Sequence, residues 1–368
     1  MDKTIKYKRI LILANNDLGL YNFRKELLER LLNDGNEVYI SLPYGPKIEE
    51  MCKLGCKFIE TNVDRRGTNV IKDINLFFQY IRIVKKIKPD VILTYTIKPN
   101  IYGGIVSRLT KTVYIENITG LGTALENKGM IQKVTILLYK VALKEAKCCF
   151  VQNTENLKFM MEKIGYNEKY KLIPGSGVNL KKFKVLEYPK EDDKIRFFFI
   201  SRIMKEKGIE QYLETAKYIV NKYPNTEFHI LGFCEQNYEE ILKELEEKNI
   251  IIYHGRKDNI IPFLKESSCT IHPSYYPEGM SNVLLESAAS GRPVITTDRS
   301  GCRETVDNEK TGYIIEERDT KELENMVEKF IKLPYEDKVK MGVLARKKME
   351  KEFDREIVIQ AYVSQIHG

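Results

Sequence analysis

The sequence contains no apolar stretch long enough to cross a membrane. A membrane-spanning helix needs about 20 predominantly apolar residues, and the densest apolar segment, residues 134–143, is interrupted by Lys140. Residues 1–9 are polar, and the apolar run over residues 10–14 is too short for the hydrophobic part of a secretory signal peptide. We therefore expect a cytoplasmic protein without a membrane span.

Cysteine and histidine are scarce where a disulfide framework or a metal site would need them. The seven cysteines are an odd number at scattered positions, which is typical of reduced thiols. Cys52 and Cys56 have no histidine nearby and no second cysteine pair at ligand spacing, so structural zinc is not expected. All four histidines lie in the second half, and no Asp-x-Asp pair suited to a divalent cation is present. We therefore expect an activity that needs neither a metal nor another cofactor.

Acidic residues are few in the first half of the chain. Residues 1–185 contain 32 Lys+Arg and 18 Asp+Glu, a net charge of +14, whereas residues 186–368 contain 28 and 34, a net charge of −6. A basic half indicates an anionic partner, such as a membrane surface, a phosphorylated acceptor or nucleic acid. No zinc finger, recognition helix or aromatic RNA-binding motif accompanies the charge, so nucleic acid is the least favoured of the three.

Short β-rich runs alternate with longer amphipathic segments, which is typical of parallel sheets with crossover helices. Helical periodicity is clear over residues 23–32, 71–87 and 131–146. Residues 181–193 lack a period and are dense in charge, so they are predicted to be a linker. Strands are predicted over residues 10–14, 37–42, 57–61, 91–94, 113–116 and 148–151, and again over residues 196–201, 227–231, 250–254, 270–272 and 294–297.

This pattern predicts an α/β protein of two doubly wound domains, each with a parallel sheet. The first domain is expected over residues 1–183 and the second over residues 194–350. In such sheets ligands bind beyond the carboxyl ends of the strands. A cleft between two such facing domains is therefore the expected site.

Residues 273–293 carry the most informative chemistry, with the sequence PSYYPEGMSNVLLESAASGRP. The segment follows the strand ending at His272 and leads through a loop into a helix capped by Ser281. Loop and helix start present backbone N–H groups and a positive dipole end, which suit a phosphate or a sugar hydroxyl. Glu278 in the loop and Glu286, about one and a half turns into the helix, can both reach such a ligand.

A second motif follows the first strand of the second domain, in the sequence FFFISRIMKEKG. It places Arg202 and Lys207 at a strand-to-helix junction, just before Gly208. Two cations at such a junction suit a diphosphate, which gains negative charge when it departs as a leaving group.

Together these motifs resemble the large family four of retaining glycosyltransferases, which have the GT-B fold. Glu278 and Glu286 match its Glu-x7-Glu motif, and the resemblance implies that they contact the donor sugar and the ribose of the nucleotide. Arg202 and Lys207 match its Arg-x4-Lys pair, which implies that they stabilise the departing diphosphate. The resemblance also implies donor contacts for Gly279, Met280, Ser281 and Asn282 and, in the base-binding loop, for Arg256.

The first domain shows looser matches. The sequence ILANNDLGLYNFRKELLERL is similar to capsule and lipid-linked oligosaccharide glycosyltransferases, and its Gly19 matches a glycine-containing loop near the donor phosphates. Where many relatives carry a His-Gly pair, this chain has Thr119 and Gly120, so no first-domain histidine can take part in catalysis. Possible sugar or acceptor contacts are therefore Asn16, Asn117, Thr119, Gly120 and Lys98, the last with a structural role as the open alternative.

The resemblance implies a retaining enzyme that transfers a sugar, a hexose or an N-acetylhexosamine, from a UDP-sugar to a glycan acceptor. A lipid-linked acceptor in bacterial surface polysaccharide synthesis and a peripheral position on the inner face of the membrane fit the basic first half. The resemblance also implies that the final helix, residues 353–366, packs back on the first domain. The alternatives are a UDP-sugar 2-epimerase of the same fold and a non-catalytic partner subunit of a glycosyltransferase.

Overall fold

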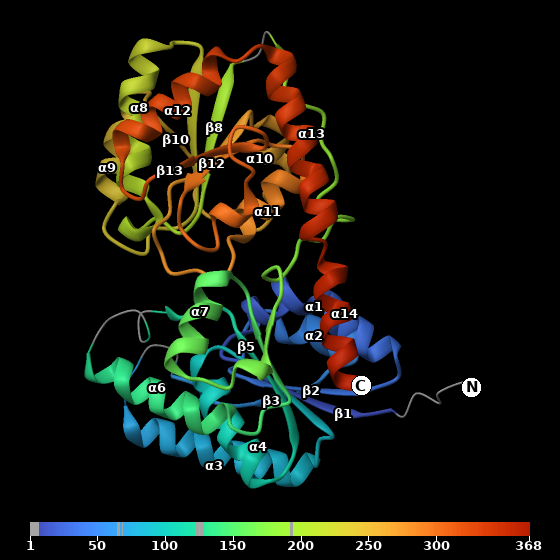
Figure 1. The fold of residues 1–368 in the computed structure, drawn as a ribbon. Coiled ribbons are helices and arrows are strands. Elements are labelled where there is room, and N and C mark those ends of the chain that lie inside the picture. Colours follow the sequence, from blue (N-terminus) through green and yellow to red (C-terminus); the bar gives the residue numbers. More distant parts are fainter. Residues whose placement is uncertain (1–6, 65–66, 68, 123–124, 126–128, 192–193) are drawn as a thin grey trace. The chain divides into compact units, whose positions relative to one another are not determined.

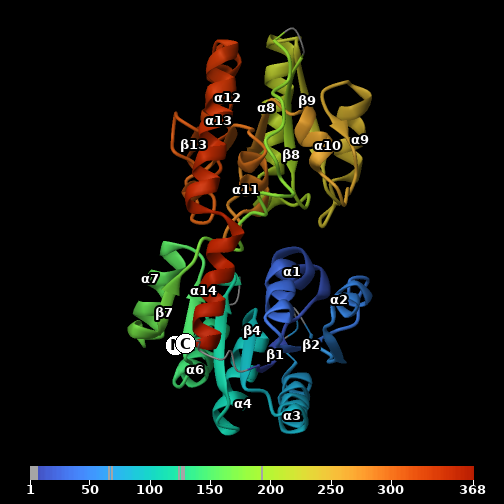
Figure 2. The same ribbon diagram turned by 90° about the vertical axis from the view of Figure 1, so that its right-hand side faces the viewer.

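The computed structural model describes residues 7–64, 67, 69–122, 125, 129–191 and 194–368. It divides into two compact units, which Figure 1 and Figure 2 show from two directions. The first unit comprises Met1–Ser176 together with Glu356–Gly368, and the second comprises Gly177–Arg355. Each unit has one parallel sheet with helices on both faces, so the predicted fold class is confirmed.

The first unit is built on a seven-stranded parallel sheet in the order β3-β2-β1-β4-β5-β6-β7. The strand order reverses between β1 and β4, which is the switch point at which such sheets bind ligands. The strands are β1 (Arg9–Leu13), β2 (Glu37–Leu42), β3 (Lys57–Glu60), β4 (Val91–Tyr95), β5 (Val113–Ile118), β6 (Cys148–Val151) and β7 (Tyr170–Leu172).

Helices cover both faces of this sheet. Because alternate residues of a strand point to opposite faces, each strand contributes side chains to two cores. Ile10 and Ile12 join a core with α1 (Asp17–Asn33), α2 (Ile48–Leu54) and α14 (Arg355–His367). Leu11 and Leu13 join a second core on the other face. The helices there are α3 (Val70–Ile87), η1 (Pro99–Gly103), α4 (Gly104–Leu109), α6 (Met130–Leu143) and α7 (Thr154–Lys163), and the short η2 (Asn167–Lys169) precedes β7.

The second unit has a six-stranded parallel sheet in the order β10-β9-β8-β11-β12-β13, with its switch point between β8 and β11. Its strands are β8 (Ile195–Ile200), β9 (Thr226–Leu231), β10 (Ile252–Tyr253), β11 (Cys269–His272), β12 (Val294–Thr297) and β13 (Gly312–Ile315). Its helices are η3 (Lys205–Lys207), α8 (Ile209–Lys222), α9 (Glu239–Glu247), α10 (Ile261–Glu266), α11 (Asn282–Ala289), η4 (Arg303–Thr305), α12 (Thr320–Lys332) and α13 (Tyr335–Glu352).

Every predicted strand is present, with ends shifted by at most a few residues, but two strands were missed. The β7 strand is a short, partly exposed edge strand and lacks an apolar run. The β13 strand begins at Gly312, where a Cβ would lie 2.0 Å from the carbonyl oxygen of Val294. A glycine that permits this close approach is read in a sequence as a turn.

The boundary between the units falls earlier than predicted. The first unit ends at Ser176, because Val178 pairs with Asp354 and Phe183 packs in a core of the second unit. The described part of the predicted linker, residues 181–191, is held to that unit, since the buried Arg292 donates to the carbonyl oxygens of Leu186 and Glu187. Residues 192–193 lie outside the described residues.

The end of the chain belongs to the first unit, as the predicted return of the final helix requires. Tyr362 of α14 is buried against Phe150, with ring centroids 4.5 Å apart, and against Tyr95 at 6.1 Å. The guanidinium of Arg24 from α1 lies 5.8 Å from the Tyr362 ring. Among the described helices, none has both the length and the apolar character needed to cross a bilayer.

We predict that Tyr362→Ala destabilises the protein by about 3–5 kcal/mol, because a fully buried aromatic side chain would leave a cavity. Urea denaturation followed by circular dichroism measures the free energy of unfolding. Tyr44→Ala is the matched control, since Tyr44 is 60% exposed. Equal losses in both variants would show that α14 contributes no core packing through Tyr362.

Candidate functional site

Three loops at the carboxyl end of the second sheet are held against one another. Tyr275 N–H, after β11, donates to Glu206 O, after β8, at 2.9 Å, and Ser281 N–H donates to Gly301 O at 2.7 Å. Gly208 has a φ of +78°, and a Cβ there would lie 2.1 Å from the carbonyl oxygen of Pro273. Only glycine permits this approach and backbone conformation, so the Arg202–Gly208 junction is fixed beside the loop that carries Glu278.

Lys207 and Glu278 form a buried ion pair at this contact, with side chains only 8% and 13% exposed. The same carboxylate receives a hydrogen bond from Ser274 Oγ at 3.3 Å and lies 3.4 Å from His272 Nε2. Burial alone would raise the pKa of Glu278, but the Lys207 ammonium and the His272 imidazole outweigh it and hold the pKa well below its usual range. Glu278 is therefore ionised, and Lys207 stabilises its charge in this buried position.

Arg202 completes a cationic pair over the ring of Tyr276. Its guanidinium carbon lies 5.1 Å from the ring centroid, and Lys207 Nζ lies 4.9 Å from it. Arg202 donates to Glu235 Oε2 at 2.5 Å and is partly exposed. Burial lowers its pKa, but the Glu235 carboxylate and Tyr276 more than offset this and leave the pKa raised. Two cations thus contact one aromatic ring, and each is paired with a carboxylate.

Glu286 differs from Glu278 in lacking a partner. It lies in α11, and its carboxylate forms no hydrogen bond or ion pair with any described residue. Burial raises the pKa of Glu286 to about 7, although Lys182 and Arg355 act in the opposite direction. Arg202, Lys207 and Glu278 are brought together, whereas Glu286 is a separate carboxyl group that titrates near neutrality.

The start of α11 places four further predicted residues. Gly279 lies against Gly301, and the Met280 side chain is buried in a core cluster. Ser281 is at the N-cap, as predicted, but its side chain makes no capping hydrogen bond. Asn282 has a buried Oδ1 without a hydrogen-bond partner. An unsatisfied buried acceptor costs free energy. A ligand hydroxyl that donated a hydrogen bond to Asn282 Oδ1 would remove this cost.

In the first unit, the structure corrects the predicted position of Gly19 and shows the partners of Asn16 and Asn117. Gly19 lies inside the first turn of α1 rather than in a loop before it, and its N–H is occupied by Asn16 Oδ1 at 2.6 Å. Asn16 is thus the N-cap, and its Nδ2 donates to Asn15. Asn117 is fully buried in β5, where it bonds Tyr362 and Gln152. These side chains have structural partners already.

The remaining predicted residues lie nearer the surface. Lys98 pairs with Asp73 at 2.6 Å, which supports the structural alternative. Thr119 and Gly120 are half-buried just after β5, and Gly120 has a φ of +142°. Arg256 follows β10 and is exposed beside Asp258 at 3.6 Å.

The histidines of the second unit have two different roles. His229 and His254 stack and share a 2.9 Å hydrogen bond between ring nitrogens. Burial lowers the pKa of both rings, which is typical of neutral histidines with a structural role. His272 instead lies beside Glu278 in the site, with its Nδ1 buried and unpartnered.

Sequence reasoning missed Glu235, Tyr276 and Ser274, which surround the cations and Glu278. Glu235, the acidic residue after β9, could have been suspected, because β9 pairs with β8 and the ends of adjacent parallel strands lie side by side. Tyr276 lies within residues 273–293. An aromatic residue in a loop does not show in the sequence that two cations will contact its ring.

One trio of possible metal ligands occurs among the described residues, namely His272, Glu278 and Cys302, with ligand atoms within 4.8 Å of one another. Lys207 already neutralises Glu278, and burial raises the pKa of the Cys302 thiol. A protonated thiol and an ammonium in the same cluster do not suit a cation. The trio is better described as a buried polar cluster.

Known protein families match both units. A family described as glycosyl transferases group 1 matches residues 181–348, and one described as glycosyl transferase 4-like matches residues 9–153. Together these matches span most of the chain, and the first includes Arg202, Lys207, Glu278 and Glu286.

Individual relatives agree with this. The chain is 25% identical to N,N'-diacetylbacillosaminyl-diphospho-undecaprenol alpha-1,3-N-acetylgalactosaminyltransferase of Campylobacter jejuni, over 96% of this chain and 97% of that protein. It is 28% identical to UDP-Gal:alpha-D-GlcNAc-diphosphoundecaprenol alpha-1,3-galactosyltransferase of Escherichia coli, over 69% of each. A solved glycosyltransferase structure from Rickettsia africae ESF-5 matches with a TM-score of 0.82 at 19% identity, over 98% of both chains. That likeness confirms the predicted GT-B fold.

We predict that Glu286 makes stability depend on pH. Its folded-state pKa, about 7, is raised above the value of about 4.3 expected in an unfolded chain. Glu286 therefore contributes to the free energy of unfolding in full below about pH 4.3, and this contribution is lost as pH rises through 7. The free energy of unfolding should fall by up to about 3 kcal/mol from this group between pH 4 and pH 8.

Glu286→Gln removes the titrating group, so the variant should lack this part of the pH dependence. Denaturant unfolding at several pH values measures it. Glu240→Gln, an exposed change of equal charge on α9, serves as the control. Identical pH profiles for wild type and Glu286→Gln would contradict the raised pKa.

Proposed function

Because the chain belongs to the glycosyltransferases, in the group 1 and 4-like families that match its two units, we propose that it is a retaining, UDP-sugar-dependent hexosyl- or N-acetylhexosaminyltransferase. The acceptor proposed is a lipid-diphosphate-linked glycan of bacterial surface polysaccharide synthesis. The observation that carries the proposal is the pair of cations, Arg202 and Lys207, above Tyr276 and beside Glu278.

The donor diphosphate is proposed to bind Arg202 and Lys207. Negative charge grows on a diphosphate as its bond to the sugar breaks, so fixed cations stabilise the transition state more than the bound donor. A diphosphate drawn to Lys207 also weakens the hold of Lys207 on Glu278. The Glu278 carboxylate then gains a free lone pair for a hydroxyl of the donor sugar.

Glu286, Asn282 and the first turn of α11 are proposed to bind the remainder of the donor. Glu286 is a carboxyl group without a partner among the described residues, and the ribose offers two hydroxyl donors. Gly279, Met280 and Ser281 shape this turn, and Arg256 is proposed to contact the base. In the retaining mechanism we propose, the departing phosphate accepts the proton of the acceptor hydroxyl, so no protein base is required and no metal or other cofactor is invoked.

The names of the relatives favour transfer over the alternatives. Both are transferases acting on diphospho-undecaprenol-linked glycans, whereas neither is an epimerase. A non-catalytic subunit would have no need for the ordered Arg202, Lys207 and Glu278 cluster.

We further propose that the first unit docks on an anionic membrane to reach its lipid-linked acceptor. Two helices expose apolar side chains along one side each. In α3 these are Val70, Ile71, Ile74 and Phe78, and in α6 they are Met130, Ile131, Val134, Leu137 and Val141. The α4–η1 segment contacts both helices, and Figure 2 shows α3, α4 and α6 together in the first unit.

Basic side chains accompany these apolar ones. Exposed lysines and arginines of the two helices and their ends are Lys72, Arg82, Lys85, Lys86, Lys88, Lys133, Lys140, Lys144 and Lys147. Apolar side chains that enter the headgroup region and cations that meet anionic lipids act together in peripheral binding. An anionic membrane would thus be a suitable partner for the charge of +14 over residues 1–185.

We predict that Arg202→Ala and Lys207→Ala each lower turnover by about 100-fold or more, because each removes stabilisation of the leaving group. Glu286→Ala should mainly weaken donor binding. Release of UDP from UDP-glucose, UDP-galactose and their N-acetylhexosamine counterparts measures turnover.

Binding of UDP itself provides the control for this experiment. UDP at about 100 times its dissociation constant should raise the free energy of unfolding by about 2.7 kcal/mol. Stabilisation by GDP or ADP but not by UDP would contradict the nucleotide assignment. Full activity of Lys207→Ala would contradict the proposed donor site.

We predict that the protein sediments with phosphatidylglycerol vesicles at low salt and less at high salt, because salt screens the lysines. Reversing the charge at Lys85, Lys86 and Lys88 to Glu should reduce binding several-fold. Ile71→Ser with Phe78→Ser should remove the part of the binding that resists salt.

A matched triple reversal in the second unit, at the exposed Lys243, Lys310 and Lys340, should leave vesicle binding unchanged. If the protein bound neutral and anionic vesicles equally, or if both triple variants lost binding alike, the proposed membrane face would be wrong.

A further inference from the structure

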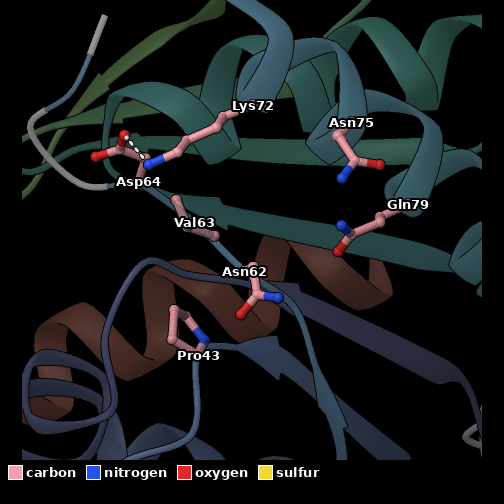
Figure 3. A pocket seen from close by; sticks show the side chains of 7 residues that line it. All are labelled: Pro43, Asn62, Val63, Asp64, Lys72, Asn75 and Gln79. Carbon is pink, nitrogen blue, oxygen red and sulfur yellow. Dashed lines mark hydrogen bonds and ion pairs between the residues drawn. The ribbon is translucent and has the colours of Figure 1, made fainter. Parts of the chain in front are cut away.

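A pocket of about 770 Å³ lies wholly within the first unit, between α3 and the loops that follow β2 and β3 (Figure 3). Pro43 and Asn62 form one side, and Asn75 and Gln79 of α3 form the other. Its volume is within the range of about 300–1,000 Å³ found for small-molecule sites. None of the residues that match the donor motifs lines it, so it is a second site, separate from the donor site.

Three carboxamides face this pocket. In Figure 3 the side chains of Asn75 and Gln79 project from α3 toward Asn62. None of the three forms a hydrogen bond with another described residue. Each carboxamide offers two N–H donors and a carbonyl acceptor, and a ligand that both donates and accepts would match all three.

One end of the pocket is organised by an ion pair. Lys72 Nζ lies 3.3 Å from Asp64 Oδ2, and Asp64 also accepts a hydrogen bond from Gly67 N–H at 2.9 Å. These contacts, the Gly67 N–H first, lower the pKa of Asp64. Lys72, the one cation among the described lining residues, is therefore neutralised by Asp64.

The position of α3 is fixed from its other side. Asp73 accepts from Lys98 at 2.6 Å and from Tyr102 at 3.0 Å, which joins α3 to the segment after β4. The side chains of Asn75 and Gln79, one turn apart on the same helix face, are therefore presented by an anchored helix. Organisation before binding reduces the free-energy cost of ordering side chains around a ligand.

This chemistry suits a neutral polyhydroxylated ligand. A sugar ring presents hydroxyl groups that donate and accept, and an N-acetyl group adds an amide with the same capacity. No aromatic side chain lines the pocket among the described residues, so a nucleobase would find no ring on which to stack.

The pocket also adjoins the apolar face of α3. At 100° per residue, Lys72, Asn75 and Gln79 lie on the side of the helix next to that of Ile71, Ile74 and Phe78. We infer that the pocket is a subsite for a sugar residue of the acceptor, next to the proposed membrane face. The assignment to the acceptor rests on the proposed function, whereas sugar binding by the pocket does not.

Saturation-transfer NMR with N-acetylglucosamine, N-acetylgalactosamine, glucose and galactose tests the subsite directly. At least one sugar should bind, and saturating UDP should not displace it, since the donor site lies in the other unit. The double variant Asn75→Ala, Gln79→Ala should weaken binding about tenfold, because two hydrogen bonds are lost. Asn62→Trp, an exposed change that fills the pocket, should abolish it.

Asn33→Ala is the matched control, since Asn33 is an exposed helical carboxamide at the far end of α1. It should bind sugar like the wild type. Absence of binding by all four sugars, displacement by UDP, or unchanged binding in both pocket variants would overturn the subsite. Stabilisation by UDP is measured separately, so a failure of the donor site would be recognised as such.

Discussion

The ion pair between Lys207 and Glu278 is the interaction on which the candidate site depends. Neither charge can stay buried alone, because removal of one partner leaves an uncompensated charge at a cost of several kcal/mol. The pair also bridges the loops after β8 and β11, which Gly208 allows to touch. The proposed diphosphate, bound at Lys207, would replace part of this neutralisation. In the proposed function, donor binding and the release of Glu278 for new hydrogen bonds are therefore two aspects of one exchange.

The two units use the same architecture differently. In the second unit, the strand ends at the switch point carry charged side chains that neutralise one another and leave Glu286 and Asn282 unpartnered. In the first unit, Asn16, which follows β1, caps α1, and Asn117 within β5 is held in core contacts. Three of its carboxamides, those of Asn62, Asn75 and Gln79, instead line the pocket beside α3. A doubly wound sheet therefore offers several strand ends, and local packing decides which of them remain available to ligands.

The sequence sufficed to predict the fold and the grouping of Arg202, Lys207 and Glu278, because both depend on local patterns. Apolar runs mark strands buried on both faces, and Arg202, Lys207, Glu278 and Glu286 lie on short segments with fixed spacing. Contacts between distant segments could not be predicted. Glu235 pairs with Arg202 across 33 positions, and Asn117 meets Tyr362 only because α14 returns to the first sheet. Gly19 was misplaced because Asn16 and Asp17 start α1 earlier than its apolar period suggests.

The apolar faces of α3 and α6 explain why periodicity alone was an incomplete guide to that part of the chain. A helix of a doubly wound domain needs one buried stripe, which Leu76, Tyr80 and Val84 provide in α3. Ile71, Ile74 and Phe78 are additional, and water-exposed side chains of this kind have a free-energy cost unless something covers them. The same helices also carry cations, so the proposed anionic membrane could cover the apolar side chains and pair with the charges. The polar face between these two stripes then carries the pocket, so a single helix would separate lipid, sugar and protein core.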